Sequence, residues 1–152
     1  MKKVFYYYSH TGSGEVVAKH FEELGYEIRL IQRKKKMPKS FFWCIMSGGF
    51  LAGIKHKDKL VDFNADIEDV DEIVIGSPIW NKRFASPTNM ALWLIGSKDL
   101  NSKKLTFVLY SGSGEAKKAV KRIQKEYPNA KIILLKEPKK YPEELEKLKD
   151  IK

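Results

Sequence analysis

Apolar positions along the chain follow two periods, which predict short strands and amphipathic helices in alternation. Strands are expected at residues 3–9, 26–31, 72–76, 105–110 and 131–135. Helices are expected at residues 15–24, 86–96, 114–127 and 142–149, the second opened by Ser86 as N-cap and Pro87 at the first helical position. This order predicts an α/β domain over residues 1–152, with a parallel sheet and helices on both faces.

The first glycine-rich segment lies between the first expected strand and the first helix. Residues 9–14 read Ser-His-Thr-Gly-Ser-Gly. A helix N-terminus offers free N–H groups and a partial positive charge, the hydroxyls add donors, and the glycines allow close backbone approach. The segment therefore suits a phosphate, and the alternative is a polar turn with no ligand.

Two later segments follow buried strands at the edge where parallel sheets bind ligands. Residues 76–87 contain Trp80, whose ring could stack on a planar ligand or pack on a neighbouring helix. Residues 110–115, Tyr-Ser-Gly-Ser-Gly-Glu, repeat the pattern of residues 9–14, although such a turn also occurs without a ligand. Together the three segments predict one phosphate-bearing ligand with a planar ring.

These three segments resemble the loops of the flavodoxin family, and the resemblance covers essentially the whole chain. The resemblance, to the short-chain type, implies a flavodoxin-like three-layer sandwich whose five-stranded parallel sheet has the order 2-1-3-4-5. It also implies non-covalently bound FMN. The implied contacts are the phosphate with Ser9, His10, Thr11, Gly12, Ser13 and Gly14, one ring side with Ser77, Pro78, Ile79, Trp80 and Asn81, and the other with Ser111, Gly112, Ser113 and Gly114.

The sequence departs from the family pattern at each loop. Gly14 replaces a threonine, so we expect a looser grip on the phosphate. No aromatic residue follows Ser111, so the outer ring face is expected to be open or to be covered by another group. Asn81 stands where many flavodoxins have glycine. Lys82 and Arg83 follow it, and a nearby cation would favour the reduced anionic flavin by roughly 1–4 kcal/mol unless both side chains are screened by solvent.

The function expected from the resemblance is electron transfer between redox partner proteins. In that role no side chain is catalytic, because the flavin performs the chemistry. The alternative is an NAD(P)H-dependent flavin or quinone oxidoreductase on the same fold. A binding module without flavin is the third hypothesis.

Charge and cysteine content limit the kinds of partner and the location expected for this chain. The formal net charge is +10, from 29 Lys and Arg against 19 Asp and Glu, which suits partners with acidic docking surfaces, an anionic cofactor, or solubility alone. The lysines are spread along the chain without recurring aromatics, which argues against nucleic acid. The single cysteine, Cys44, allows no internal disulfide and fits a cytoplasmic location, for which the absence of a signal-peptide pattern also argues. The sequence has no cluster of cysteine and histidine residues at the spacing of a metal site, so no metal is expected.

Residues 41–54 form an apolar run between lysine-rich flanks. The run is shorter than the roughly 20 residues that a membrane span requires. We expect a crossover helix packed on the sheet, interrupted or not at Gly48-Gly49, with Cys44 as a buried, inert thiol. The alternatives are a lid or weak dimer surface near the flavin, and an anchor on a membrane surface. If the run is a crossover helix, we expect a monomer with no membrane partner.

Overall fold

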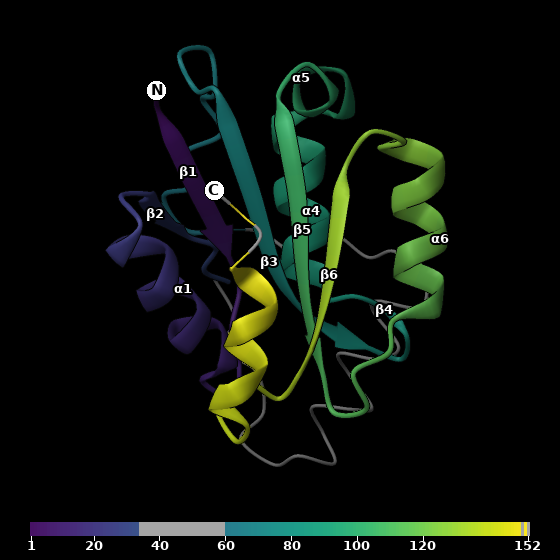
Figure 1. The fold of residues 1–152 in the computed structure, drawn as a ribbon. Coiled ribbons are helices and arrows are strands. Elements are labelled where there is room, and N and C mark those ends of the chain that lie inside the picture. The colour runs from purple at the N-terminus through teal and green to yellow at the C-terminus, as the bar shows by residue number, and fades with distance from the viewer. Residues whose placement is uncertain (34–59, 150, 152) are drawn as a thin grey trace.

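The computed structural model describes residues 1–33, 60–149 and 151, and its centre is a parallel sheet (Figure 1). Its strands are β1 (Lys3–Tyr7), β2 (Glu27–Leu30), β3 (Glu72–Trp80), β5 (Lys104–Ser111) and β6 (Lys131–Lys136). They pair in the order β2-β1-β3-β5-β6, and the two-residue strand β4 (Arg83–Phe84) pairs antiparallel with the end of β3. The predicted order 2-1-3-4-5 is confirmed for the five parallel strands.

Helices cover both faces of the sheet, which gives three layers (Figure 1). One face carries α1 (Ser13–Glu23) and the 3₁₀ helix η2 (Pro142–Leu148), and the other carries α4 (Ser86–Ile95) and α6 (Lys117–Glu126). The short helix α5 (Ser97–Asn101) follows α4 at the edge where the strands begin. The carboxyl ends of the strands are therefore left to the connecting loops.

Alternating side chains of each strand enter two separate hydrophobic clusters. From β1, Val4 and Tyr6 pack toward α4 and α6, whereas Phe5 and Tyr7 pack toward α1 and η2. The rings of Phe5 and Phe21 stack at 4.6 Å between centroids. Burying each such side chain contributes roughly 1.5–3 kcal/mol, so both helix layers are held firmly on the sheet.

Strand β3 is longer than the prediction, which ended it at residue 76. Residues 77–80, expected in a loop, continue the strand because Ser77 and Pro78 pair with β5 and the next two residues pair with β4. Asn81 and Lys82 join β3 to β4 at φ 51° and 64°. Positive φ at both central residues is the geometry of a type I′ hairpin turn, whose usual sequence is Asn-Gly.

The starts of helices α4 and α6 also differ from the prediction. The N-cap of α4 is Ala85 and not Ser86. Helix α6 begins at Lys117 and not at residue 114, because neither Gly114, at φ +78°, nor the N-cap Ala116, at φ −154°, is helical. Glu115 therefore lies in the loop before α6.

The closing segment is a 3₁₀ helix and not an α-helix. It repeats every three residues, so its ion pairs join Glu144 to Lys147 and Glu146 to Lys149, at i,i+3 and not at the predicted i,i+4. Residues 41–54, with Cys44, lie outside the described residues.

Candidate functional site

The three polar segments meet at one edge of the sheet. The strands β1, β3 and β5 are adjacent and parallel, so their carboxyl ends lie side by side. The Tyr8 N–H donates to the Gly76 carbonyl at 3.1 Å, and Pro78 pairs with Tyr110. The Tyr110 hydroxyl donates to the Tyr8 carbonyl, so the third segment is tied to the residue that precedes the first segment.

The first segment is folded around the hydroxyl of Ser9. Its oxygen accepts the backbone N–H groups of Gly12 at 3.2 Å and Gly14 at 3.1 Å. Gly12 is the N-cap of α1 at φ +97°, a conformation that favours glycine. His10 and Thr11 are exposed, whereas Ser13 and Gly14 are buried. The loop thus gathers backbone donors at the positive end of α1, as a phosphate site requires.

Gly14 occupies a space with no room for a side chain. A Cβ atom there would lie 2.5 Å from Cβ of Ser9 and 2.9 Å from both the Tyr110 hydroxyl and Cδ2 of Tyr7. Burial, and then the charge of Glu15, raise the pKa of Tyr110 well above its usual value, so this hydroxyl stays protonated. A threonine would not fit at this position, because Tyr110 fills it.

The second segment has two kinds of side chain. Ser77 is fully buried, and its hydroxyl hydrogen-bonds with Thr88 of α4 at 2.7 Å, so it is directed away from the loops. Pro78, Ile79 and Trp80 are half-buried at the end of β3. The Trp80 ring meets the Tyr8 ring edge-on at 5.8 Å between centroids. The tryptophan therefore packs on Tyr8, just after β1, while part of its surface stays accessible.

The hairpin tip is attached to the start of α6. The carbonyl of Lys82 accepts the N–H of Ala119 at 2.9 Å, in the first turn of that helix. The side chains of Asn81 and Lys82 are exposed, and Arg83 is half-buried opposite Trp80. This bond places the second segment beside the third, which leads into the same helix.

The third segment is small and open. Ser111 is half-buried, Gly112 and Ser113 are exposed, and the Ser113 hydroxyl accepts the N–H of Glu115 at 3.2 Å. Residues 111–116 read Ser-Gly-Ser-Gly-Glu-Ala, without an aromatic ring. The loop therefore lines the edge of the site without covering it.

A fourth segment at this edge was not predicted. Residues 137–141 follow β6, where the Glu137 N–H donates to the Ser111 carbonyl at 3.1 Å. The ammonium of Lys139 donates to the Thr11 carbonyl at 3.3 Å. The signal was present in the sequence, because β6 also ends at this edge and is followed by two lysines.

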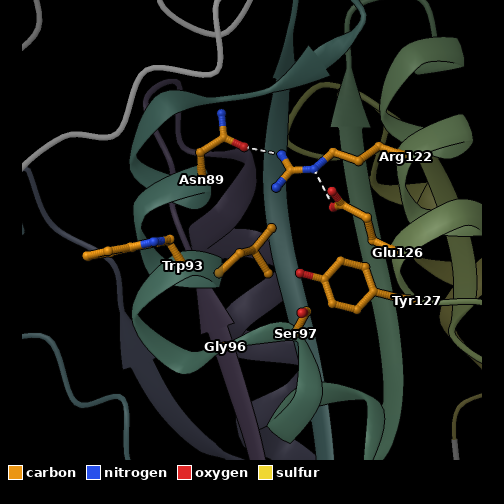
Figure 2. Close-up of a pocket in the computed structure, with 8 residues that line it drawn as sticks. Asn89, Trp93, Gly96, Ser97, Arg122, Glu126 and Tyr127 are labelled. Carbon is orange, nitrogen blue, oxygen red and sulfur yellow. Dashed lines mark hydrogen bonds and ion pairs between the residues drawn. The ribbon is translucent and has the colours of Figure 1, made fainter.

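A groove of about 510 Å³ lies elsewhere, between α4 and α6 (Figure 2). Arg122 crosses it, donating to Glu126 at 2.7 Å and to Asn89. These polar groups are thus already bonded to one another. Within residues 1–33 and 60–149, no helix is long and apolar enough to cross a membrane, and no three acidic, histidine or cysteine side chains gather as a metal site.

Comparison with known families gives a match over most of the chain. The sequence model of the family described as NADPH-dependent FMN reductase matches residues 9–137. This span contains all three predicted segments. No curated protein matches the sequence.

Several solved structures share the fold. A candidate flavoprotein from Bacteroides eggerthii DSM 20697 is 18% identical, with a TM-score of 0.74 over 95% of this chain and 96% of that one. A flavoprotein from Lactobacillus acidophilus NCFM, solved in complex with FMN, is 16% identical, with a TM-score of 0.67 over 93% and 97%. A candidate flavoprotein from Bacteroides uniformis ATCC 8492 is 24% identical, with a TM-score of 0.62 over 87% and 89%. These likenesses establish the flavodoxin-like three-layer fold.

Proposed function

We propose that this chain, which belongs to the family of NADPH-dependent FMN reductases, oxidises NADPH at the carboxyl ends of β1, β3 and β5. The family match over residues 9–137 is the observation that carries the proposal. It favours the NAD(P)H-dependent oxidoreductase, the alternative drawn from the sequence, over the electron carrier. It does not single out the short-chain flavodoxins.

FMN is the cofactor, and the first segment has the groups that its phosphate needs. The N–H groups of Gly12 and Gly14 converge on one point, now taken by the Ser9 hydroxyl, at the N-terminus of α1. The residues proposed to hold the phosphate are Ser9, His10, Thr11, Gly12, Ser13 and Gly14. When bound, FMN supplies the redox chemistry, taking two electrons from NADPH and passing them to an acceptor.

The two other segments are proposed to flank the ring. Pro78, Ile79, Trp80 and Asn81 would line one side, with Ser77 contributing through its backbone because its hydroxyl is bonded to Thr88. Ser111, Gly112, Ser113 and Gly114 would line the other. The small residues of this third segment leave space for a nicotinamide ring, which supports a reductase that admits NADPH directly.

The test is NADPH oxidation by the purified protein loaded with FMN. We expect absorbance at 340 nm to fall faster with holoprotein than with apoprotein or with the same concentration of free FMN, when a quinone or excess FMN is the acceptor. NADH in place of NADPH measures the preference between the two nucleotides. A yellow holoprotein that does not oxidise NADPH but accepts electrons from reduced redox proteins would contradict the reductase proposal and favour the electron carrier.

A further inference from the structure

The turn after β6 places a lysine on the phosphate loop. The turn is closed by the N–H groups of Lys140 and Tyr141, which donate to the Glu137 carbonyl at 2.8 and 2.9 Å. From it the Lys139 side chain reaches the Thr11 carbonyl, 128 residues away in sequence. It also lies against the backbone of Gly12: a Cβ atom there would be 2.9 Å from Cδ of Lys139 and 3.0 Å from its Nζ.

The neighbouring lysines are engaged by other groups. Lys147 and Lys149 pair with glutamates of η2, and the ammonium groups of Lys136 and Lys140 lie 5.3 and 5.5 Å from the centre of the Tyr141 ring. Within the described residues, Lys139 contacts no carboxylate and bonds only the Thr11 carbonyl. An ammonium has three donors, so two remain for a ligand.

We propose that Lys139 binds the phosphate of FMN and neutralises part of its charge. The phosphate of FMN carries a charge of about −1.5 to −2 at neutral pH. The loop beside it offers neutral hydroxyls and backbone N–H groups, and Gly14 provides no hydroxyl because Tyr110 fills that space. The Lys139 ammonium compensates for this loss with a charge-assisted hydrogen bond. This inference rests on FMN being held at the first segment.

The test compares FMN with riboflavin, which has the same ring but no phosphate. Binding to apoprotein is followed by quenching of flavin fluorescence for the wild type, Lys139→Gln, Lys139→Arg and Lys140→Gln. The last variant is the matched control, since it removes an adjacent exposed lysine that lies on Tyr141. Thermal melting of each apoprotein confirms folding.

We expect Lys139→Gln to weaken FMN roughly tenfold and to leave riboflavin within about twofold. Lys139→Arg should keep most of the preference for FMN, and Lys140→Gln should change neither ligand. The salt dependence of FMN binding should also become shallower in Lys139→Gln, because one cation is lost from the site.

Three results would overturn the inference. They are equal effects of Lys139→Gln and Lys140→Gln, equal weakening of FMN and riboflavin by Lys139→Gln, and a wild type that binds both flavins alike. The reductase is tested separately: if wild type binds FMN through Lys139 but does not oxidise NADPH, the proposed function fails and the lysine keeps its role.

Discussion

Gly14 and Gly112 stand in segments of similar sequence, but their surroundings differ. Gly14 is enclosed by Ser9, Tyr7 and Tyr110, whereas only an oxygen of Glu137, at 4.0 Å, would lie near a Cβ atom on Gly112. From the sequence alone, Gly14 is a missing hydroxyl in the phosphate loop. The structure shows that its role is to admit the Tyr110 hydroxyl between β1 and α1.

These surroundings predict opposite outcomes for one substitution. Gly14→Ala should lower the free energy of unfolding by about 1–3 kcal/mol, because its methyl group must displace packed atoms. Gly112→Ala should be neutral or stabilising by up to about 1 kcal/mol, because alanine restricts the unfolded chain and meets open space. Urea unfolding of both variants measures the difference. Equal costs would show that the contacts around Gly14 relax freely.

Tyr110 predicts a specific loss of stability in alkali. Burial raises the pKa of the Tyr110 hydroxyl well above its usual value of 10.0. Above pH 10 the unfolded chain releases this proton while the folded protein keeps it, so stability falls as pH rises, by at most about 1.4 kcal/mol per pH unit. Below pH 10 this contribution is fully present.

Tyr110→Phe isolates that contribution. At pH 7 the variant should be less stable by roughly 1 kcal/mol, because the Tyr8 carbonyl loses its donor. Between pH 10 and 11 the wild type should lose stability faster than the variant, so the difference shrinks or reverses. Urea unfolding at pH 7, 10 and 11 measures it. A difference that stays constant across these pH values would show that Tyr110 titrates normally.

At the scale of elements, the β3–β4 hairpin joins two parts of the site. Its turn contains Asn81 and Lys82 at positive φ, and the Lys82 carbonyl binds the first turn of α6. Asparagine tolerates this conformation, but a lysine in the left-handed region costs roughly 1–2 kcal/mol. The turn therefore stores strain next to the predicted ring site.

Replacing Lys82 by glycine should release part of this strain. We expect Lys82→Gly to raise the free energy of unfolding by about 0.5–1 kcal/mol. This is the strain relieved in the left-handed conformation minus the extra backbone entropy that glycine loses on folding. Lys121→Gly, in the exposed middle of α6, removes the same charge as Lys82→Gly. It should lower the free energy of unfolding by about 1 kcal/mol, because glycine is unfavourable inside a helix. Thermal unfolding of both variants tests the contrast. A loss at both positions would mean that the turn is not strained.

The elements themselves were predictable where burial sets the pattern. Residues 73–75 and 107–109 are apolar on both faces because helices cover both sides of the sheet. Local geometry was less visible: the start of α6 depends on the positive φ of Gly114, and β4 depends on a turn without the usual glycine at position 82. Neither leaves a periodic signal in the sequence.

At the scale of the molecule, the sequence predicted the sheet order and the three segments at its edge through the resemblance to flavodoxins. It did not predict that residues 137–141 return to the first segment, because the contact between Lys139 and Thr11 joins residues 128 positions apart in the chain. The groove between α4 and α6 was missed because it forms between two helices that meet only in the folded protein. The sequence indicates that β6 ends at the same edge, but which side chains meet there follows from the assembled fold.

The net charge of +10 predicts how the whole molecule meets an acceptor protein. A basic surface attracts acidic partners over distances set by the screening length, which falls from about 30 Å at 0.01 M salt to about 8 Å at 0.15 M. We therefore expect FMN-loaded protein, reduced beforehand so that NADPH plays no part, to transfer electrons to an acidic acceptor protein more slowly as salt rises. Steering of this kind accelerates association by roughly 10- to 1000-fold at low salt.

Stopped-flow measurement of the second-order rate constant at these salt concentrations tests that expectation. A neutral quinone is the control, because its collision with the protein gains nothing from charge, and its rate should stay constant. The rate with the acidic protein should fall several-fold over the same range, since docking and not electron transfer carries the salt dependence. A rate with the acidic acceptor as insensitive to salt as that with the quinone would show that acceptor docking does not depend on the basic surface.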